Sequence, residues 1–309
     1  MKTPPGYGSA DAATGLPQAM KPKKSLYGLR QSPRNWFNTI NDSLKDMAFT
    51  PTTYGPCVYT FGTSETFSIL TLYVDDLLLL GGNTPVLQKL KRKLINQFAT
   101  TDMGDISLVL GMQITSDREA GTLTISQEHY AKSILARFGM AGSNPVHTTG
   151  AGAELSIDQP DDLLLDPTGT ELYQSITGSL MFLSQCTRCD ITYSVNQFAR
   201  AMSKPPKLRM TAAKHLLRYL KGNMSLGLTY RTGCFRLTGF CDASWGNNPD
   251  NGKSPSGYLF MMGGGPPSFT TALQSVTPQS AMEAELISMA LASKRGGLSL
   301  KQHLLTTGV

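Results

Sequence analysis

Residues 69–80 read ILTLYVDDLLLL and constrain the fold more than any other stretch of the chain. Two adjacent carboxylates, Asp75 and Asp76, interrupt an otherwise apolar and β-rich run. Because charges within a core are costly, the run is predicted to fold as a hairpin with the aspartates at its tip. A divalent cation could bind there, since Mg²⁺ takes one or two carboxylates together with substrate phosphates. A plain polar turn at the surface is the alternative.

Length and charge narrow the class of protein. The chain has 309 residues, enough for two domains, and a formal net charge of +6. The excess of Lys and Arg suits a polyanionic partner such as nucleic acid, although many basic proteins bind none. Residues 1–15 contain no apolar signal segment, and the run at 70–80 is too short to span a bilayer. We therefore expect an intracellular protein with no membrane partner, in the cytoplasm or the nucleus.

The five cysteines do not indicate a disulfide scaffold, because their number is odd in a long chain. Cys186 and Cys189 have the C-x-x-C spacing of zinc and redox sites. A zinc site needs a second pair of ligands at matching spacing, and neither His215 nor Cys234 with Cys241 supplies one. Structural cysteines without a disulfide-linked partner are expected.

Apolar periodicity and turn residues predict an α+β chain with a boundary near residue 230. Helices are predicted to begin at Ser32-Pro33 and Thr84-Pro85, with Ser and Thr as N-caps and one apolar stripe each. Ser126 is predicted to cap a third helix. Further helices are predicted at 172–184, 191–202, 208–220 and from 282, strands at 67–80, 108–114, 122–125, 226–230, 237–241 and 257–262, and a linker at 142–170.

A second pair of carboxylates follows residue 230. Asp242 lies in the stretch FCDASWG at 240–246, and Glu285 lies near the start of the helix predicted from 282. A strand-end Asp and a helix Glu on one cation suit a nuclease, because the metal must make a water molecule nucleophilic. The alternative is that Asp merely ends a strand and Glu merely begins a helix. Glu283 and Glu285 are about 200° apart on a helix, so they cannot face one site equally.

Several stretches resemble copia-type retrotransposon polymerases. Residues 25–36, SLYGLRQSPRNW, are similar to the family signature S-L-Y-G-L-[KR]-Q-[SA]-P-R-x-W, and YVDD at 73–76 to the Y-x-D-D box of reverse transcriptases. LGMQI at 110–114, YQSITGSLMFL at 173–183 and HLLRYL at 215–220 resemble later family segments. The resemblance covers almost the whole chain and implies an RNA-directed DNA polymerase followed by RNase H.

The resemblance also implies the domains. It predicts part of the palm and fingers of a right-hand reverse transcriptase fold, with the start of the thumb, at 1–140. A largely helical thumb and connection would follow at 141–230, and the first half of an RNase H-like α/β domain at 231–309. By the same resemblance, the partners are an RNA template, a DNA primer and deoxynucleotide triphosphates.

Functional residues follow from the polymerase boxes by resemblance. Asp75 and Asp76 would be catalytic and hold Mg²⁺ or Mn²⁺. The remaining residues would contact the incoming nucleotide and template (Arg30, Gln31, Ser32, Pro33, Tyr73) or form a primer grip (Leu110, Gly111, Met112).

The later boxes resemble those of the copia-type RNase H domain. DASW at 242–245, KSPSGY at 253–258 and SAMEAE at 280–285 are similar to three of its motifs. The resemblance implies that Asp242 and Glu285 are catalytic and bind the same kind of metal ion. The family pattern, a Glu followed by an apolar residue, favours Glu285 over Glu283.

Some family features are not matched. The family polymerase uses another aspartate on a strand upstream of its signature, and Asp11, the acidic residue before Ser25, has no strand pattern around it. Residues 1–7 resemble the segment after that strand, and further RNase H aspartates would lie beyond Val309. Cys189 stands where the family motif T-R-P-D-I has Pro, and residues 268–274 and 291–305 also depart from the pattern.

We therefore expect a truncated product that is catalytically incomplete on its own and poorly soluble. Two alternatives stay open: a non-catalytic nucleic-acid-binding module, and a degenerate transposon relic without function.

Overall fold

The computed structural model describes residues 23–53, 55–150, 156, 158–233, 235–297 and 300. Residues 1–7, Asp11 and Cys234 lie outside this range, as do parts of the segments 142–170 and 291–305. Contacts divide the described chain into two units, residues 23–102 and residues 103–300. The domain boundaries at 140 and 230 were inferred from the family resemblance and not from contacts, and they stay a prediction.

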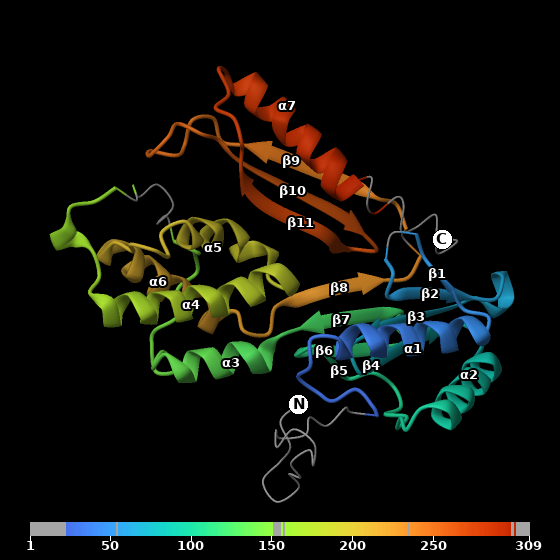
Figure 1. Ribbon diagram of the computed structural model, residues 1–309. Coiled ribbons are helices and arrows are strands. Elements are labelled where there is room, and N and C mark those ends of the chain that lie inside the picture. The colour runs from blue at the N-terminus through green and yellow to red at the C-terminus, as the bar shows by residue number, and fades with distance from the viewer. Residues whose placement is uncertain are drawn as a thin grey trace, which may run out of the picture. The chain divides into compact units, whose positions relative to one another are not determined.

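The described residues of the first unit form a four-stranded antiparallel sheet with two helices (Figure 1). Its strands are β1 (Thr50–Pro51), β2 (Val58–Phe61), β3 (Ser68–Tyr73) and β4 (Asp76–Gly81), in that order, with a 3-10 turn η1 (Ser64–Thr66) before β3. Helix α1 (Ser32–Asp46) buries Ile40 and Leu44, and α2 (Thr84–Gln97) buries Leu90 and Leu94, against Leu70 of β3. The predicted apolar stripes of both helices are thereby confirmed.

The predicted helix caps are wrong by one residue. Gln31, not Ser32, is the N-cap of α1, because the Ser32 hydroxyl is hydrogen-bonded to a carbonyl of the preceding loop. Asn83, not Thr84, caps α2, and its side chain accepts a hydrogen bond from the helix backbone. Asn is the stronger N-cap residue of the two. The third helix, α3 (Glu128–Arg137), is likewise capped by Gln127 instead of residue 126.

The second unit begins with another four-stranded antiparallel sheet. It contains β5 (Leu108–Val109), β6 (Met112–Asp117), β7 (Thr122–Ser126) and β8 (Gly227–Arg231), in that order. The single strand predicted at 108–114 is wrong. Leu110 and Gly111, with φ of 49° and 76°, form a two-residue turn between β5 and β6. Positive φ at both central residues is the pattern of a type I′ hairpin turn.

A helical bundle follows in the same unit. It consists of α3, α4 (Pro167–Cys186), α5 (Thr192–Ala199) and α6 (Lys207–Gly222), with 3-10 turns η2 (Asp161–Leu163) and η3 (Cys189–Ile191). One core collects buried side chains such as Ile134, Leu180 and Leu216. The Tyr173 hydroxyl donates to the Phe198 carbonyl over 2.9 Å and links α4 to α5, and burial raises the pKa of Tyr173 to about 12. The three helices predicted between 172 and 220 are confirmed, with shifted ends.

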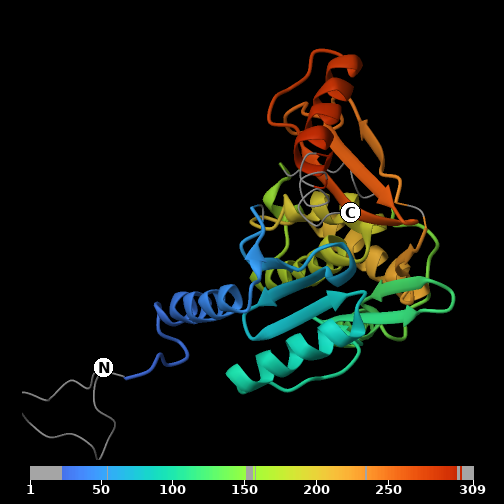
Figure 2. The ribbon, with the colours of Figure 1, turned by 90° about the vertical axis from the view of Figure 1, so that its right-hand side faces the viewer.

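The last described elements are a three-stranded antiparallel sheet and a helix. The sheet has the order β11-β10-β9 and contains β9 (Thr238–Ala243), β10 (Pro255–Met262) and β11 (Gly265–Leu273). Helix α7 (Ala281–Ala292), with a π-helical turn at Ser293–Gly297, lies along β9 and β10, in red in Figure 2. Ala284 and Ser288 face the sheet, and the Ser288 hydroxyl donates to the Asp242 carbonyl over 2.8 Å. Small side chains on this face let the helix approach closely.

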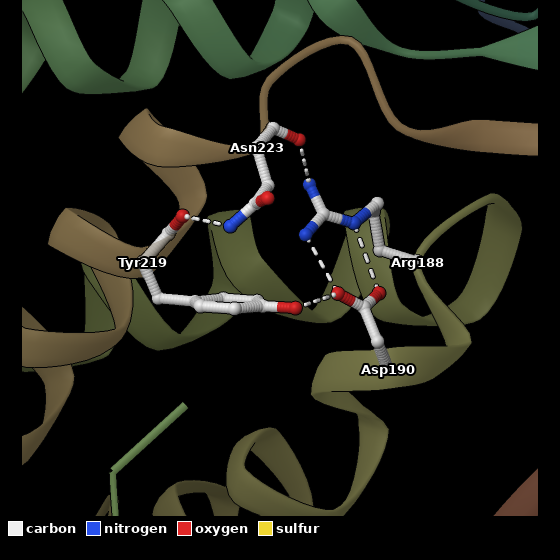
Figure 3. Close-up of polar contacts among 4 residues, drawn as sticks. All are labelled: Arg188, Asp190, Tyr219 and Asn223. Carbon is white, nitrogen blue, oxygen red and sulfur yellow. Dashed lines mark hydrogen bonds and ion pairs between the residues drawn. The ribbon is translucent and has the colours of Figure 1, made fainter. Parts of the chain in front are cut away.

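A buried ion pair ties η3 to α6 (Figure 3). Arg188, only 2% exposed, donates two hydrogen bonds to the Asp190 carboxylate, over 2.9 and 2.7 Å, and one to the Asn223 carbonyl over 2.9 Å. The Tyr219 hydroxyl donates to the same carboxylate over 2.9 Å. Burial alone would raise the pKa of Asp190, but the hydrogen bonds and positive charge of Arg188 outweigh it and lower that pKa below its ordinary value.

Candidate functional site

The hairpin of β3 and β4 carries the paired aspartates at its exposed tip. Tyr73 pairs with Asp76, so Val74 and Asp75 form a two-residue turn. Leu70, further down β3, is fully buried, whereas Asp75 and Asp76 are exposed. The predicted hairpin, with its carboxylates outside the apolar layer, is confirmed. Adjacent carboxylates presented to solvent in this way are suitable oxygen ligands for a divalent cation.

The signature at residues 25–36 reaches this tip through one hydrogen bond. The Ser32 hydroxyl donates to the Leu26 carbonyl over 2.5 Å and holds the loop against the start of α1. One turn later, Trp36 donates from Nε1 to the Val74 carbonyl over 2.7 Å. Apolar spacing alone did not indicate this contact. The signal for it is the polar N–H of an indole within an otherwise apolar stripe, because a buried indole N–H needs a partner.

The predicted nucleotide-contacting residues lie beside this loop and at the end of β3. Arg30, Gln31 and Pro33 are exposed, Ser32 is half-buried, and Tyr73 is 59% exposed. Gln31 stands at the N-terminus of α1, where backbone N–H groups without helical partners can meet an anion. Their contact with a nucleotide stays a prediction.

The predicted primer grip is the β5–β6 turn of the second unit. Leu110 is 39% exposed at the turn, and Met112 is half-buried at the start of β6. Next to it, the Gln113 side chain accepts a hydrogen bond from the His129 backbone N–H over 3.0 Å, which fastens the hairpin to α3. An exposed apolar turn on a fastened hairpin can contact the flat faces of a nucleic acid, and this role also stays a prediction.

The second pair of carboxylates lies on β9 and α7. Asp242 is exposed on β9. Ala243, which follows Asp242 in the chain, donates a hydrogen bond from its backbone N–H to Glu285 Oε1 over 3.4 Å. Glu283 is engaged elsewhere, because its Oε2 accepts from the Gln279 N–H over 2.7 Å at the helix start. Of the two glutamates, Glu285 is therefore the one that contacts the backbone next to Asp242, and its role at a metal site stays a prediction.

The residues present fit a divalent cation only as partial ligand sets. Within the part of the chain that the structure describes, no three His, Cys, Asp or Glu side chains are grouped closely enough to hold a metal ion. Carboxylate oxygens are the ligands that Mg²⁺ and Mn²⁺ prefer, so Asp75 with Asp76, and Asp242 with Glu285, have the right chemistry. Each pair would need ligands from a substrate or from other residues.

The cysteines of the C-x-x-C motif have the environment of structural thiols. Cys186 and Cys189 are unbridged, and burial raises the pKa of both, helped at Cys189 by the negative charge of Asp190. Since a thiolate is the form that binds metal or attacks a disulfide, a raised pKa makes both residues poorly suited to either role.

Helix α6 is basic, as its sequence indicated. It contains Lys and Arg residues but no Asp or Glu. Two of the basic side chains hold a loop along the helix: Arg218 Nε donates to the Asn144 carbonyl over 2.7 Å, and Lys221 Nζ to the Ser143 carbonyl over 2.5 Å. Carbonyl groups carry no net charge, so these contacts do not neutralise the charges of Arg218 and Lys221.

No helix among the described residues is both long enough and apolar enough to cross a membrane.

Comparisons with known proteins assign the family. Residues 1–150 match the family model described as reverse transcriptase (RNA-dependent DNA polymerase). The chain is 36% identical, over 93% of its length, to the retrovirus-related Pol polyprotein from transposon TNT 1-94 of Nicotiana tabacum, and 30% identical, over 94%, to that from transposon RE1 of Arabidopsis thaliana. It spans only 22% and 19% of these two polyproteins.

A relative of similar length gives the same result. The chain is 30% identical to the putative transposon Ty5-1 protein of Saccharomyces cerevisiae, over 85% of this chain and 84% of the relative. Together with the hairpin bearing YVDD, these likenesses show that the chain belongs to the reverse transcriptase family of copia-type retrotransposon Pol polyproteins.

Proposed function

We propose that the β3–β4 hairpin is the metal-binding turn of an RNA-directed DNA polymerase palm. The observation that carries the proposal is the placement of Asp75 and Asp76 at an exposed tip directly above a buried apolar strand, in a chain of the reverse transcriptase family. The two carboxylates would hold Mg²⁺ or Mn²⁺. When bound, such an ion neutralises charge on the phosphates during nucleotidyl transfer.

The other predicted residues then act by binding and orienting substrates. Arg30 and the helix start at Gln31 offer positive charge and N–H donors to a triphosphate. Tyr73, on the strand that leads to the turn, offers a flat face to a base. The β5–β6 turn at Leu110–Met112 would hold the primer strand against the template. The substrates would be deoxynucleotide triphosphates on an RNA template with a DNA primer.

The sheet of β9–β11 with α7 is proposed as part of an RNase H-like domain. Asp242 and Glu285 would share a divalent ion, because the Glu285 carboxylate is held one residue away from Asp242 along the β9 backbone. The ion would make a water molecule nucleophilic for phosphodiester hydrolysis.

Activity of this polypeptide alone is proposed to be low. Catalysis by two metal ions depends on several carboxylates around them, and the described residues offer only a pair at each predicted site. Primer extension on an RNA template with Mg²⁺ or Mn²⁺ tests the low activity directly, and any extension that is seen also tests the assignment of the turn. We expect no extension, or trace extension that Asp75→Ala removes. Robust extension that is lost in Asp75→Ala would overturn the proposal that this polypeptide alone has low activity. Extension that Asp75→Ala leaves unchanged would overturn the assignment of the turn as the metal site.

A second candidate is a nucleic-acid-binding module without catalysis. The specific observation behind it is α6, which carries no acidic residue and has four Lys and Arg side chains that are exposed or half-buried (Lys207, Lys214, Arg218, Lys221), whereas its Arg209 is buried. Binding to phosphates would then weaken steeply as salt rises. RNA binding that falls with salt and is unchanged in Asp75→Ala would favour this candidate. Binding that is independent of salt would count against it.

A further inference from the structure

The indole N–H of Trp36 donates a hydrogen bond to the backbone of the Val74–Asp75 turn. Trp36 lies in the second turn of α1, and its Nε1 is 2.7 Å from the Val74 carbonyl oxygen. Its ring is half-buried and meets the Phe98 ring edge-on, with 5.7 Å between the ring centroids. The donor stands on a helix that is itself held by the buried side chains Ile40 and Leu44, so the hydrogen bond restrains the turn instead of following it.

The turn needs such a restraint because of its first residue. Val74 has φ of 54°, and of the two central residues it alone has a positive φ. This is the pattern of a type II′ turn, in which glycine is usual at the first central position. A β-branched residue adopts left-handed backbone only when its surroundings hold it there. Val74 is 59% exposed, so packing of its own side chain does little to hold it.

The hydrogen bond acts on the peptide that carries Asp75. The Val74 carbonyl and the Asp75 N–H belong to one planar peptide group. Rotation of that group by about 180° converts a type II′ turn into a type I′ turn and changes the backbone direction at the second central residue. A donor fixed to the Val74 oxygen therefore selects one of the two turns.

We propose that Trp36 is a positioning residue for the metal-binding turn. Its indole N–H holds the Val74–Asp75 peptide in one orientation, and this orientation sets the direction in which the Asp75 carboxylate meets a divalent cation. The inference rests on the proposed metal site at Asp75 and Asp76. It adds a link between the signature at residues 25–36 and the YVDD turn: the signature builds the start of α1, and α1 aligns the turn.

A purely structural role for Trp36 makes a different prediction. If only the ring matters, through its contact with Phe98, any change that loosens this packing should act on the turn. Trp36→Phe keeps an aromatic ring and removes the N–H, whereas Phe98→Leu keeps the N–H and removes the ring contact. The two variants separate the donor from the packing.

The experiment is a Mn²⁺ titration of the full chain followed by electron paramagnetic resonance, with Asp75→Asn as the reference for loss of the site. Folding of each variant is checked by circular dichroism. We expect Trp36→Phe to weaken Mn²⁺ binding about threefold to tenfold, the worth of one hydrogen bond. Phe98→Leu should bind Mn²⁺ as the unaltered chain does. Unchanged binding in Trp36→Phe, or an equal loss in both variants, overturns the inference.

The same titration separates this inference from the function on which it rests. If Asp75→Asn binds Mn²⁺ as well as the unaltered chain does, the metal site itself fails. If Asp75→Asn loses binding and Trp36→Phe does not, only the positioning role fails.

A second measurement covers the case in which Trp36→Phe does not fold. The chain has two tryptophans, so Trp245→Phe leaves one indole N–H signal in a ¹H–¹⁵N spectrum. We expect this Trp36 signal to be protected from solvent exchange and to shift when Mg²⁺ is added, with no shift once Asp75→Asn is also present. A signal that exchanges as fast as a solvated indole, or that ignores Mg²⁺, overturns the inference.

Discussion

Replacing Asp190 by Asn should destabilise the helical bundle of the second unit, because Asp190 is the counter-charge of the buried Arg188. The change leaves the Arg188 guanidinium, whose side chain is 3% exposed, with the Asn223 carbonyl and no counter-charge. Removing one partner of a buried ion pair lowers the free energy of unfolding by about 3–5 kcal/mol, because the other charge is left unpaired. The Asp190 side chain is 31% exposed, and Asn can still accept one hydrogen bond. We therefore expect a loss of about 2–4 kcal/mol.

The assay is amide hydrogen exchange of α4 and α6 at increasing urea, which reports the opening free energy of the bundle itself. Asp162→Asn is the matched control, because Asp162 is exposed on η2 and should cost less than about 0.5 kcal/mol. The double variant Arg188→Met with Asp190→Asn should be more stable than Asp190→Asn alone, since no buried charge is left unpaired. If Asp190→Asn behaves as Asp162→Asn does, or if the double variant is the less stable, the reasoning is wrong.

The same pair predicts a dependence on pH. The pKa of Asp190 is lowered in the folded state, so its contribution to stability is present above the unfolded pKa, near 3.9, and is lost as the pH falls through the folded pKa. The bundle of the unaltered chain should lose stability below about pH 4. Asp190→Asn should remove part of this slope, and an identical acid slope in both proteins would contradict the assignment.

Three further changes test other parts of the fold. Val74→Gly should stabilise the first unit by about 0.5–1 kcal/mol, because glycine accepts a positive φ. The measurement is Trp36 fluorescence during urea unfolding in a Trp245→Phe background, and a loss of stability would count against strain at the turn. Gly111→Val should destabilise the β5–β6 hairpin by about 1–2 kcal/mol, seen as faster amide exchange in both strands, and unchanged exchange would be the contrary result. Arg218→Gln should speed proteolysis of the loop at residues 143–150 about threefold to tenfold, because the bond to its carbonyl is lost, and an unchanged rate would show that the loop is held by other contacts.

Apolar periodicity predicted the helices of this chain well, whereas the strands β1, β2 and β11 were not predicted. The spacing of Ile40 with Leu44, and of Leu90 with Leu94, indicated the buried faces of α1 and α2, because a helix buries one stripe regardless of its neighbours. The two carboxylates within an apolar run indicated a hairpin tip, since the alternative was an unpaired charge in a core. Both inferences depend on burial, which is the strongest physical signal a sequence carries.

Local hydrogen bonds were harder to predict, because several residues compete for each of them. Ser32 is a good N-cap by type, yet its hydroxyl is used by the loop before α1. The turn at Leu110–Gly111 was missed because leucine rarely has a positive φ, so LGMQI read as one strand. The ion pair of Arg188 and Asp190 was also missed, since two charged residues near the end of an apolar helix look like solvated ones until their partners on α6 are known.

The two candidate metal sites have a common feature that their sequence motifs do not reveal. In each, a side chain from a helix hydrogen-bonds to the backbone next to an aspartate: Trp36 to the Val74 carbonyl before Asp75, and Glu285 to the Ala243 N–H after Asp242. A carboxylate that binds metal must be held in its direction before the ion arrives, because every rotamer lost on binding weakens affinity. At the first site the indole fixes the neighbouring peptide without using a carboxylate oxygen, whereas at the second site the contact uses Oε1 of Glu285, which is itself a proposed ligand. If the proposed metal site is right, the motif at residues 25–36 would act through the backbone beside Asp75, and substitutions of Trp36 should lower metal affinity while leaving both acidic residues in place.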